Sequence, residues 1–561
     1  MGFHFRRGPT LLAAALLSVG VVVAPTAQAQ APYQVLVFSK TAGFRHDSIP
    51  AGIQAIRDLG AANGFTVTST EDSATFTPTE LAKYAAVVFL STTGDVLDGT
   101  QQGAFESYVN GGGGFVGVHA AADTEYDWPY YGQLVGAYFS SHPNIQQATV
   151  RVEDRAHPAT AHLAPAWSRT DEWYNYRTNP RSTSHVLANL DEASYSGGTM
   201  GGDHPISWCR PQSAGRAFYT GLGHTIESYA DPAFRTHLLG GIRYAAGVAK
   251  ADCRAETGYT SLFTGSTSGW SQAGPGSFGN ADATLTSQGG PGNFWYSAKE
   301  FGSYSLKLDW RLTGDGDSGV FLGFPASSAA QPIGYEVAID ATGDPNATTG
   351  AVHGVRAPDT AVRDAAVNPA GQWNTFELLV EGERLRVYLN GRQVNDFTNT
   401  DPARSLQQGH IGLQNLGNGA SSFRNVRIKE LGGATPQVVQ GEAYTSSFGV
   451  QRANHGGASG GQTVGYIDNG DWAAYSQVNT AAARTFTARV SSGGAGGRIE
   501  IRSGSSTGPL LGSVAVANTG SWDTFTTIST ALTGSANGQV VLVFTGTGGG
   551  GLFDVDTFTL S

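Results

Sequence analysis

The chain contains very little cysteine: only Cys209 and Cys253 occur in its 561 residues. Two thiolates are too few for a zinc site with four cysteine ligands, and too few for a disulfide-rich scaffold. In an oxidising compartment the two could pair with each other, but their spacing along the chain does not give the distance between them. A disulfide and two free thiols therefore both remain open.

Charged residues are also scarce, at 14% of the chain, and the formal net charge is −11. No long run of Lys or Arg occurs, so we expect no nucleic-acid partner, which would require clustered basic side chains. The 77 glycines and the 40% hydrophobic content instead indicate folded, β-rich domains with many tight turns. A chain of this length should form about three to four domains.

Long hydrophobic runs are missing beyond the start of the chain. There, Arg6 and Arg7 precede an apolar run over 11–24 and a small-residue cleavage sequence at 27–29. This is the pattern of an export signal over residues 1–29. An uncleaved membrane anchor is the alternative, but the run is shorter than the about 20 residues of a membrane span. The sequence thus predicts a secreted, extracellular protein with no membrane contact after cleavage.

Residues 33–250 alternate between strand and helix patterns. The short apolar runs typical of buried parallel strands are 34–39, 85–91 and 115–118. Between the first two runs, apolar residues recur at helical spacing over 53–59. This βαβ pattern predicts a doubly wound α/β domain, whose ligands would lie beyond the carboxyl ends of the strands.

In the second half of the chain the hydrophobic period changes to two, which predicts antiparallel strands. Every second side chain in 304–312 is apolar, and Asn390-Gly391 is a type I′ hairpin sequence between two alternating runs. Residues 258–431 are therefore predicted to form a β-sandwich. A Gly- and Pro-containing linker is predicted at 432–437, and short strands resume over 438–561.

The turn after the third apolar run places His119 where a doubly wound sheet presents a catalytic side chain. Because that position holds neither Cys nor Ser, nucleophilic acyl transfer is not expected. The motifs GFVGVHAAADT, DEWY, GDHPISW and GRAFYTGLGHT follow in this order. With them, residues 33–250 resemble the trehalose-utilisation (ThuA-like) family, which has a glutamine-amidotransferase-like fold. The resemblance implies a pocket lined by His119, Asp123, His142, Asp171, Glu172, His204 and His224.

Two interpretations of this polar pocket stay open. Neutral imidazole is a common nitrogen ligand, so the histidines and acids could bind a divalent metal. No HExxH-like spacing ties them together, however, and histidines beside Gly or Pro also satisfy buried backbone groups. We expect a functional polar pocket, with metal binding as one alternative.

The strand predicted over 334–340 carries two carboxylates on one face. With its alternate apolar residues in the core, Glu336 and Asp340 face outward with their Cα atoms about 13 Å apart. Ordinary glycosidase carboxylate pairs are about 5 to 9.5 Å apart, so these two fit only if a bulge or a lean of the side chains closes the distance. The polar face of a half-exposed strand would give the same pattern.

The motifs GDSGVFLGF, GYEVAID, GQWNTFEL and GHIGLQ make 258–431 similar to the 3-keto-disaccharide hydrolase family, a concanavalin-like sandwich. Ala338 stands where the family commonly has Gln, and Leu416 where it commonly has His. The resemblance implies that a base removes the C2 proton beside a C3 ketone, after which the C1 substituent leaves. The residues expected to carry this step are Glu336 or Asp340 as base, with His410 or Arg311 as donors to the enolate oxygen.

The motifs GYIDNGDW, TGSWDTF and FDVDTF make 438–561 resemble a family-6 carbohydrate-binding module. Such modules bind sugars between two exposed aromatic rings, which would here be Tyr466 and Trp522, and Asp554 stands where an Asn usually completes the site. The family also has a structural calcium site, whose pattern Glu442 and Asp556 fit. The resemblance therefore implies a polysaccharide partner and a bound Ca²⁺.

Two functions fit this order of domains, an α/β doubly wound domain followed by two all-β sandwiches. The first is a secreted hydrolase or lyase that cleaves glycosidic bonds of ordinary or 3-keto-glycosides while its last domain holds polysaccharide. The second is a secreted glycan-binding or adhesion protein in which no domain turns over substrate. The departures at Ala338 and Leu416 favour binding, whereas two enzyme-family domains in one chain favour catalysis.

Overall fold

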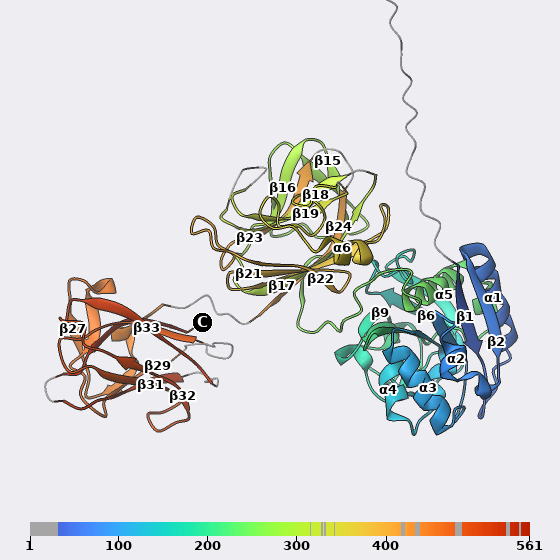
Figure 1. Cartoon of the computed structure of the whole chain (residues 1–561), viewed down its shortest axis with the longest axis horizontal. Coiled ribbons are helices and arrows are strands. Elements are labelled where there is room, and N and C mark those ends of the chain that lie inside the picture. Colours follow the sequence, from blue (N-terminus) through green and yellow to red (C-terminus); the bar gives the residue numbers. More distant parts are fainter. Residues whose placement is uncertain are drawn as a thin grey trace, which may run out of the picture.

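The computed structural model describes residues 32–560 apart from 315, 327–328, 330–331, 342, 417–420, 432–437, 477–484, 534–538 and 549–550. The predicted export signal, 1–29, and the predicted linker, 432–437, lie outside these described residues. Figure 1 shows an α/β part followed along the chain by two β-rich parts. Within the described residues, no helix is long and apolar enough to cross a membrane.

A nine-stranded sheet forms the centre of the α/β part, in the order β2-β1-β3-β4-β11-β10-β9-β6-β7. The strands are β1 (Tyr33–Phe38), β2 (Phe65–Thr70), β3 (Ala86–Leu90), β4 (Gly114–Val118), β6 (Gln146–Val152), β7 (Ala166–Asp171), β9 (His185–Leu190), β10 (Pro205–Gln212) and β11 (Gly215–Thr220). The first five in this order run parallel, and the rest pair antiparallel. The short strands β5 (Phe139–Ser141) and β8 (Asn175–Tyr176) pair separately.

Helices accompany the parallel strands, which confirms the predicted doubly wound α/β domain. They are α1 (Ile49–Asn63), α2 (Pro78–Leu81), α3 (Gly99–Asn110), α4 (Pro129–Val135) and α5 (Pro232–Ala245). The helical spacing at 53–59 lies within α1, which ends at Gly64 in the left-handed conformation that glycine adopts without strain. The apolar runs predicted as strands are β1, β3 and β4. All five side chains of β3 are buried because both faces of the sheet are covered.

Two antiparallel sheets form the middle part. The larger has the order β14-β15-β24-β17-β20-β21-β22 with β12 beside β24, and the smaller has the order β13-β16-β23-β18-β19. Their bounds are β12 (Thr260–Phe263), β13 (Trp270–Ala273), β14 (Ser277–Ala281), β15 (Thr284–Gln288), β16 (Pro291–Tyr296), β17 (Tyr304–Leu312), β18 (Asp317–Phe324), β19 (Tyr335–Asp340), β20 (Asn374–Glu381), β21 (Arg384–Leu389), β22 (Arg392–Thr398), β23 (His410–Leu416) and β24 (Ser421–Glu430), with helix α6 (Thr360–Ala366).

One core lies between these two sheets, since Leu308 of β17 and Val337 of β19 belong to the same hydrophobic cluster. This confirms the predicted sandwich. The predicted hairpin at Asn390-Gly391 joins β21 to β22, and both residues have positive φ, 47° and 82°. Such angles are those of a type I′ turn, which matches the twist of the paired strands.

The terminal part is also a sandwich of two antiparallel sheets, as predicted. The orders are β27-β28-β35-β30-β33 with β25 beside β35, and β26-β29-β34-β31-β32. The bounds are β25 (Val439–Gln440), β26 (Ser446–Phe448), β27 (Gln451–Asn454), β28 (Gln462–Gly465), β29 (Trp472–Ser476), β30 (Thr485–Ser491), β31 (Gly497–Ser503), β32 (Leu510–Val516), β33 (Phe525–Ala531), β34 (Gln539–Thr545) and β35 (Asp554–Leu560). Its core is a separate hydrophobic cluster.

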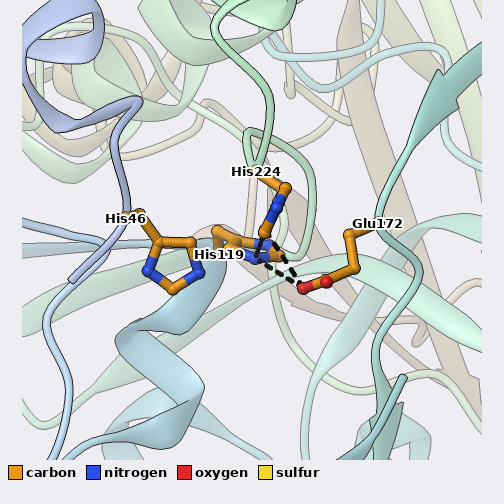
Figure 2. Close-up of side chains that lie close together, drawn as sticks. All are labelled: His46, His119, Glu172 and His224. Carbon is orange, nitrogen blue, oxygen red and sulfur yellow. Dashed lines mark hydrogen bonds and ion pairs between the residues drawn. The ribbon is translucent and has the colours of Figure 1, made fainter. Parts of the chain in front are cut away.

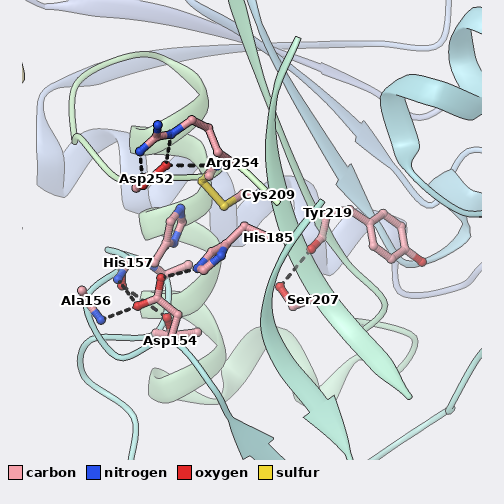
Figure 3. Close-up of a disulfide and its surroundings, with 12 residues drawn as sticks. Asp154, Ala156, His157, His185, Ser207, Cys209, Tyr219, Asp252 and Arg254 are labelled. Carbon is pink, nitrogen blue, oxygen red and sulfur yellow. Dashed lines mark hydrogen bonds and ion pairs between the residues drawn. A yellow bond between two sulfur atoms is a disulfide. The ribbon is translucent and has the colours of Figure 1, made fainter. Parts of the chain in front are cut away.

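A disulfide joins Cys209 of β10 to Cys253, so the pairing that the sequence left open is present (Figure 3). It ties the segment that follows α5 to the α/β sheet. The same segment forms ion pairs with the middle part: the Nζ of Lys307 lies 2.9 Å from a carboxylate oxygen of Asp252 and 2.9 Å from one of Glu256. The connection between the first two parts is therefore covalently tied to one of them and ion-paired to the other.

Candidate functional site

Four side chains converge at one edge of the α/β sheet: His46, His119, Glu172 and His224 (Figure 2). They follow strands β1, β4, β7 and β11 respectively. Because these strands run in the same direction, their carboxyl ends meet at one edge and bring together residues that are far apart in the sequence.

The polar atoms of this cluster face one another at short distances. The Nε2 of His119 lies 3.1 Å from the Nδ1 of His224. One oxygen of Glu172, Oε2, lies 3.4 Å from that His119 nitrogen and 3.1 Å from that His224 nitrogen. The His46 ring packs edge-on against both other rings, with centroids 5.0 Å away. One nitrogen or oxygen from each of the four residues lies within 4.8 Å of all the others.

The backbone and a carbonyl group fix the orientation of His119. Its φ of 50° is unusual for a residue with a Cβ and turns the chain sharply after β4. The Nδ1 of the fully buried ring lies 2.9 Å from the carbonyl oxygen of Gly221. A carbonyl can only accept, so this nitrogen carries the hydrogen, and in the neutral ring Nε2 presents its lone pair to the cluster.

Asp171 supports the cluster from behind. Its carboxylate accepts hydrogen bonds from the backbone N–H groups of Gly223, at 2.9 Å, and His224, at 3.1 Å. The Nη2 of Arg169 donates to it at 2.9 Å. Asp171 therefore positions the loop that carries His224 instead of contributing an oxygen to the cluster.

The charges within the cluster follow from burial and from these contacts. Burial, reinforced by the neighbouring imidazoles of His119 and His224, lowers the pKa of His46 to about 3. Although burial alone would raise it, the neighbouring imidazoles of His119 and His224 hold the pKa of Glu172 well below its usual range. For His224, burial acts downward, but the Glu172 carboxylate raises the pKa above its usual value. At neutral pH, His46 is neutral and Glu172 is ionised.

The other residues predicted to line this pocket lie at different places. His142 borders the cluster, with its Nδ1 2.9 Å from the second oxygen of Glu172 and its side chain 44% exposed. Asp123 accepts a hydrogen bond from Tyr126. His204 is buried away from the cluster, where its Nδ1 bonds Glu192 at 2.8 Å and its Nε2 bonds a backbone carbonyl at 2.8 Å.

His46 is the member of the cluster that sequence reasoning missed. It stands in a loop rich in polar residues, without a motif around it. The signal that could have found it is its place shortly after the first apolar run, since the carboxyl end of that strand had to share an edge with the end of β4.

In the middle part, Glu336 of β19 lies half-buried on the outer face of the smaller sheet. The Nε2 of Gln414 donates a hydrogen bond to its Oε2 at 3.1 Å. A Cβ at Gly319, on the neighbouring β18, would lie 2.6 Å from the other oxygen, so glycine leaves room there for the carboxylate. Burial raises the pKa of Glu336 to about 7.

Two buried amides on the same face of the sheet as this carboxylate have polar atoms without partners among the described residues. Asn293 of β16 is completely buried, and neither its oxygen nor its nitrogen has a hydrogen-bond partner in the part of the chain that the structure describes. The same holds for the Oε1 of Gln414, which is in register with Asn293. Buried polar atoms without partners cost free energy, so a polar group bound at this row would stabilise these amides.

Aromatic rings border this polar row. Trp295, Phe321 and Phe324 form a small hydrophobic cluster of their own on the outer face, apart from the sandwich core. The His410 ring packs against Trp295 with centroids 4.5 Å apart, and its Nδ1 donates to the Tyr296 carbonyl at 2.9 Å. His410 thus shares a face with Glu336, but it stands two strands away, roughly 10 Å in the hydrogen-bonding direction.

Arg311 requires a correction. It lies on β17 of the larger sheet, where Trp310 and Leu312 point into the core and the Arg311 guanidinium stacks on Trp373 at 4.8 Å. It therefore faces away from the sandwich on the side opposite Glu336. The prediction that Arg311 could donate to an oxygen beside Glu336 is wrong, because alternation along a strand does not tell which sheet the strand joins.

Asp340 stays separated from Glu336 along β19. The register between β18 and β19 continues without a shift from Glu336 to Asp340, which is paired with Asp317. No bulge shortens the strand, so the two carboxylates keep the spacing of a regular strand, with Cα atoms about 13 Å apart. A glycosidase pair made of these two alone is not supported.

The terminal part has a cavity of about 530 Å³ that is lined by Ala453, Asn454, His455, Tyr466, Asp468, Trp522, Gly551 and Asp554. The three residues predicted to bind sugar, Tyr466, Trp522 and Asp554, thus line one cavity. Tyr466 is 62% exposed. Gly493 leaves room for the indole of Trp522, because a Cβ at this position would lie 2.7 Å from the indole nitrogen.

His455, which sequence reasoning missed, connects two acids at this cavity. Its Nε2 lies 2.8 Å from Asp554 and its Nδ1 lies 3.1 Å from Asp523. The hydroxyl of Thr463 also donates to Asp554, at 3.0 Å. Burial raises the pKa of Asp554, so its charge depends on these partners. The floor of the cavity offers both donors and acceptors to sugar hydroxyls.

The side chains at the expected calcium site differ in whether their oxygen atoms already have hydrogen-bond partners. The Oε2 of Glu442 and the Oε1 of Gln440 are buried without partners among the described residues. Both side chains approach the same glycine, Gly460, so their oxygens lie near each other. Asp556 accepts from the Ser459 N–H at 2.8 Å and pairs with Arg489. Unpartnered carboxylate and amide oxygens fit a hard cation such as Ca²⁺.

Three protein families match consecutive regions of the chain. Residues 34–245 match the family described as trehalose utilisation. Residues 258–429 match the 3-keto-alpha-glucoside-1,2-lyase-like domain. Residues 440–561 match the carbohydrate binding module of family 6. These are the families, and the order, that the motifs predicted.

Curated relatives and solved structures share parts of the chain. Endo-1,4-beta-xylanase A of Thermoclostridium stercorarium is 37% identical over 111 residues, 19% of this chain and 22% of the relative. Arabinoxylan arabinofuranohydrolase of Bacillus subtilis is 43% identical over 104 residues, 18% of this chain and 20% of the relative. The chain thus spans about a fifth of the length of these curated relatives.

Among solved structures, a ThuA-like protein from Bacteroides uniformis is 25% identical and covers 40% of this chain and 95% of its own, with a TM-score of 0.35. A beta-1,3-glucan binding family 6 module from Bacillus halodurans is 37% identical and covers 22% of this chain and 96% of its own, with a TM-score of 0.22. By its family matches, the chain carries a trehalose utilisation domain, a 3-keto-alpha-glucoside-1,2-lyase-like domain and a family 6 carbohydrate binding module, in this order.

Proposed function

We propose that the chain is a secreted enzyme that cleaves the glycosidic bond of 3-keto-glycosides in its middle domain while its terminal module binds polysaccharide. The observation that carries this proposal is the face around Glu336. There, a half-buried carboxylate with a raised pKa accepts a hydrogen bond from Gln414. The Oε1 of Gln414 and both polar atoms of Asn293, on the same face, lack partners among the described residues. The aromatic rings of Trp295 and Phe321 border it. Polar groups on an apolar platform suit a sugar ring.

The chemistry requires one base and donors to one oxygen. The ionised Glu336 carboxylate takes the proton from C2 beside the C3 ketone, and the electron pair of that bond forms the enolate. The enolate collapses to an enone as the bond from C1 to the leaving oxygen breaks, and that oxygen takes up a proton. Water then adds to C1 and a proton returns to C2, so the net reaction is hydrolysis; release before this addition is the lyase outcome. The amide of Gln414, which already donates to Glu336, has a second N–H that can donate to the enolate oxygen.

The test is incubation of the full-length protein with a panel of 3-oxidised and ordinary glycosides, with product analysis by mass spectrometry. Glu336→Gln keeps the shape of the side chain but removes its basicity, so it should lower turnover by at least about a hundredfold. Asp340→Asn is the matched control on the same strand, and its turnover should fall much less. An equal loss in both variants, or a larger loss in Asp340→Asn, would contradict the assignment of the base.

Polysaccharide binding by the terminal module is supported by the cavity between Tyr466 and Trp522. The curated relatives act, by their names, on xylan and arabinoxylan, so we propose β-linked plant polysaccharides as the first ligands to test.

We also propose a structural Ca²⁺ at Glu442. Added calcium should then raise the melting temperature of the wild-type module, and Glu442→Gln should reduce that rise.

Secretion is proposed from the predicted export signal, and the disulfide supports it, because such bonds persist mainly in oxidising compartments. The second candidate function is a non-catalytic secreted glycan-binding protein. Ala338 and Gly319, which are paired in register, favour it, because neither of them contributes a polar group beside Glu336. If the wild-type protein yields no product from any glycoside of the panel yet binds polysaccharide, this second function replaces the first.

A further inference from the structure

We infer that the trehalose utilisation domain binds one first-row divalent transition-metal ion through His46, His119, Glu172 and His224. This inference concerns a different domain from the proposed cleavage site and does not depend on it. Three imidazoles and one carboxylate converge there from four strand ends, with one ligand-type atom of each within 4.8 Å of the others. Figure 2 shows their polar atoms directed toward a common centre.

The donor set selects the class of ion. Imidazole nitrogens suit Zn²⁺, Co²⁺, Ni²⁺ and related ions, whereas Ca²⁺ and Mg²⁺ take oxygen ligands almost exclusively. A site with three nitrogen donors and one ionised oxygen neutralises part of the charge of a divalent ion and leaves room for a further ligand. The cluster is therefore suited to a transition metal and not to the hard cation proposed for the terminal module.

The hydrogen bonds around His119 leave its inner nitrogen available to an ion. The Gly221 carbonyl oxygen, 2.9 Å from Nδ1, requires the hydrogen on that nitrogen, so Nε2 faces the cluster as a lone pair. Histidines that bind metals usually donate their other N–H to a carbonyl or carboxylate in this way. His119 is completely buried, so a hydrogen bond to solvent does not explain why this lone pair faces the cluster.

His46 provides a second, independent observation. It is 4% exposed, and its Nδ1 is buried without a hydrogen-bond partner in the described part of the chain. The ring lies edge-on to His119 and His224, with centroids 5.0 Å away from each. Figure 2 shows the other ring nitrogen on the side of these two rings. A metal ion bound between the three rings would give that nitrogen a ligand in place of the water that burial removes.

Two exposed side chains border the cluster. His142 is 44% exposed and contacts the Glu172 oxygen that faces away from His119. Phe44, which is 68% exposed, packs edge-on against His46 with centroids 4.9 Å apart. The cluster is thus buried but lies next to side chains that reach the surface. Within the described residues, the second close group of such atoms is His157 with the two cysteines, which is no candidate because the sulfurs are bonded to each other.

The experiment uses the full-length protein, stripped with chelator and dialysed. It is titrated with Zn²⁺ and with Co²⁺ by calorimetry, and bound metal is counted by elemental analysis. We expect the wild type to bind one equivalent of Zn²⁺ in addition to any Zn²⁺ bound at other sites. With Co²⁺ it should give the visible absorption spectrum of an ion that has nitrogen ligands. His224→Ala and Glu172→Gln should each weaken this binding at least about tenfold and remove the Co²⁺ spectrum. Far-ultraviolet circular dichroism verifies that each variant is folded.

Two controls separate this site from others. His162→Ala removes an exposed histidine of the same domain whose ring bonds the Ala233 carbonyl outside the cluster, and it should bind metal like the wild type. His455→Ala removes the histidine between the two acids of the terminal module. Loss of Zn²⁺ binding in His455→Ala alone would place the ion in that module and overturn the inference. So would a wild-type protein that binds neither ion more tightly than about 1 mM, which corresponds to a binding free energy too weak for a built site.

Discussion

At the scale of single residues, Glu336 shows how burial sets both reactivity and stability. Its carboxyl lies over Gly319, beside an aromatic cluster, with one hydrogen bond from Gln414. Loss of water disfavours the ionised form, and the pKa rises from 4.5 to about 7. A base with a pKa near neutral pH combines a substantial ionised fraction with a strong tendency to take a proton.

The first prediction is the pH dependence of this residue. For a 3-keto-glycoside, kcat/KM of the wild type should rise with pH and reach a plateau above about pH 7, because only the ionised carboxylate is a base. Glu336→Gln should show a low and flat profile over the same range, and Asp340→Asn should keep the wild-type shape. A wild-type profile that is already flat between pH 5 and 8 would show that another group is the base.

The same pKa shift also makes the stability of the middle domain depend on pH. Because the folded-state pKa of Glu336 is raised, its contribution to stability is fully present below about pH 4.5 and is lost as the pH rises through about 7. Glu336→Gln carries no charge, so it should gain stability relative to the wild type across this window. The gain should be at most about 3 kcal/mol, visible as a rising difference in melting temperature for the middle domain. A difference independent of pH would contradict the shift.

The residues of the candidate sites differ in how far the sequence could reveal them. His119, Glu172 and His224 stand in motifs, and their strand-end positions follow from a parallel sheet. His46 has no motif, and His204 stands in the motif GDHPISW but bonds Glu192 away from the cluster. A motif indicates that residues belong to one region, whereas the direction of each side chain depends on packing that only the folded chain determines.

At the scale of secondary-structure elements, local patterns predicted strands well and their partners poorly. The alternation in 304–312 corresponds to β17 at the same bounds, and Asn390-Gly391 makes the expected turn. Yet β17 and β19 belong to opposite sheets, so Arg311 and Glu336 face apart. Period and turn chemistry are local properties, whereas sheet membership depends on pairings such as β17 with β24, which are more than a hundred residues apart.

The disulfide between β10 and the segment after α5 gives the prediction at this scale. Its cysteines are 44 residues apart, and closing a loop of this length restricts the unfolded chain by about 4 kcal/mol in the chain-entropy model. The double variant Cys209→Ser, Cys253→Ser should therefore lower the melting temperature of the α/β domain. Reductant should lower the wild-type value in the same way and leave the variant unchanged. Equal melting temperatures for reduced and oxidised wild type would mean that the bond adds little.

At the scale of the whole molecule, three separate hydrophobic cores share one chain. The first two are connected by the disulfide-tied segment and by buried ion pairs between Lys307 and the acids of that segment. The terminal core is built from residues 439–560 alone. Its cavity, with Tyr466 and Trp522, is far in sequence from Glu336. Binding and cleavage should therefore be separable by substitution, which distinguishes targeting from a direct role of the module in catalysis.

The prediction that follows compares an insoluble polysaccharide with a small soluble substrate. Trp522→Ala and Tyr466→Ala each remove one aromatic wall of the cavity, and truncating such an anchor often costs about 2 kcal/mol or more of binding free energy. The affinity of the full-length protein for the polysaccharide, measured by co-sedimentation with the insoluble material, should thus fall at least about thirtyfold. Turnover of a small 3-keto-glycoside should stay at the wild-type rate, because that substrate needs only the middle domain.

Phe448→Ala is the matched control for this comparison. Phe448 is as exposed as Tyr466, at 63% against 62%, and belongs to the same module, but it does not line the cavity. Its removal should leave both retention and turnover unchanged, which separates a loss of the sugar platform from a general loss of surface aromatic area. If Phe448→Ala weakens retention as much as Trp522→Ala does, the polysaccharide contacts a broad surface and not this cavity. If the cavity variants instead abolish turnover of the small soluble substrate, the module takes part in the reaction itself, and targeting is not its whole role.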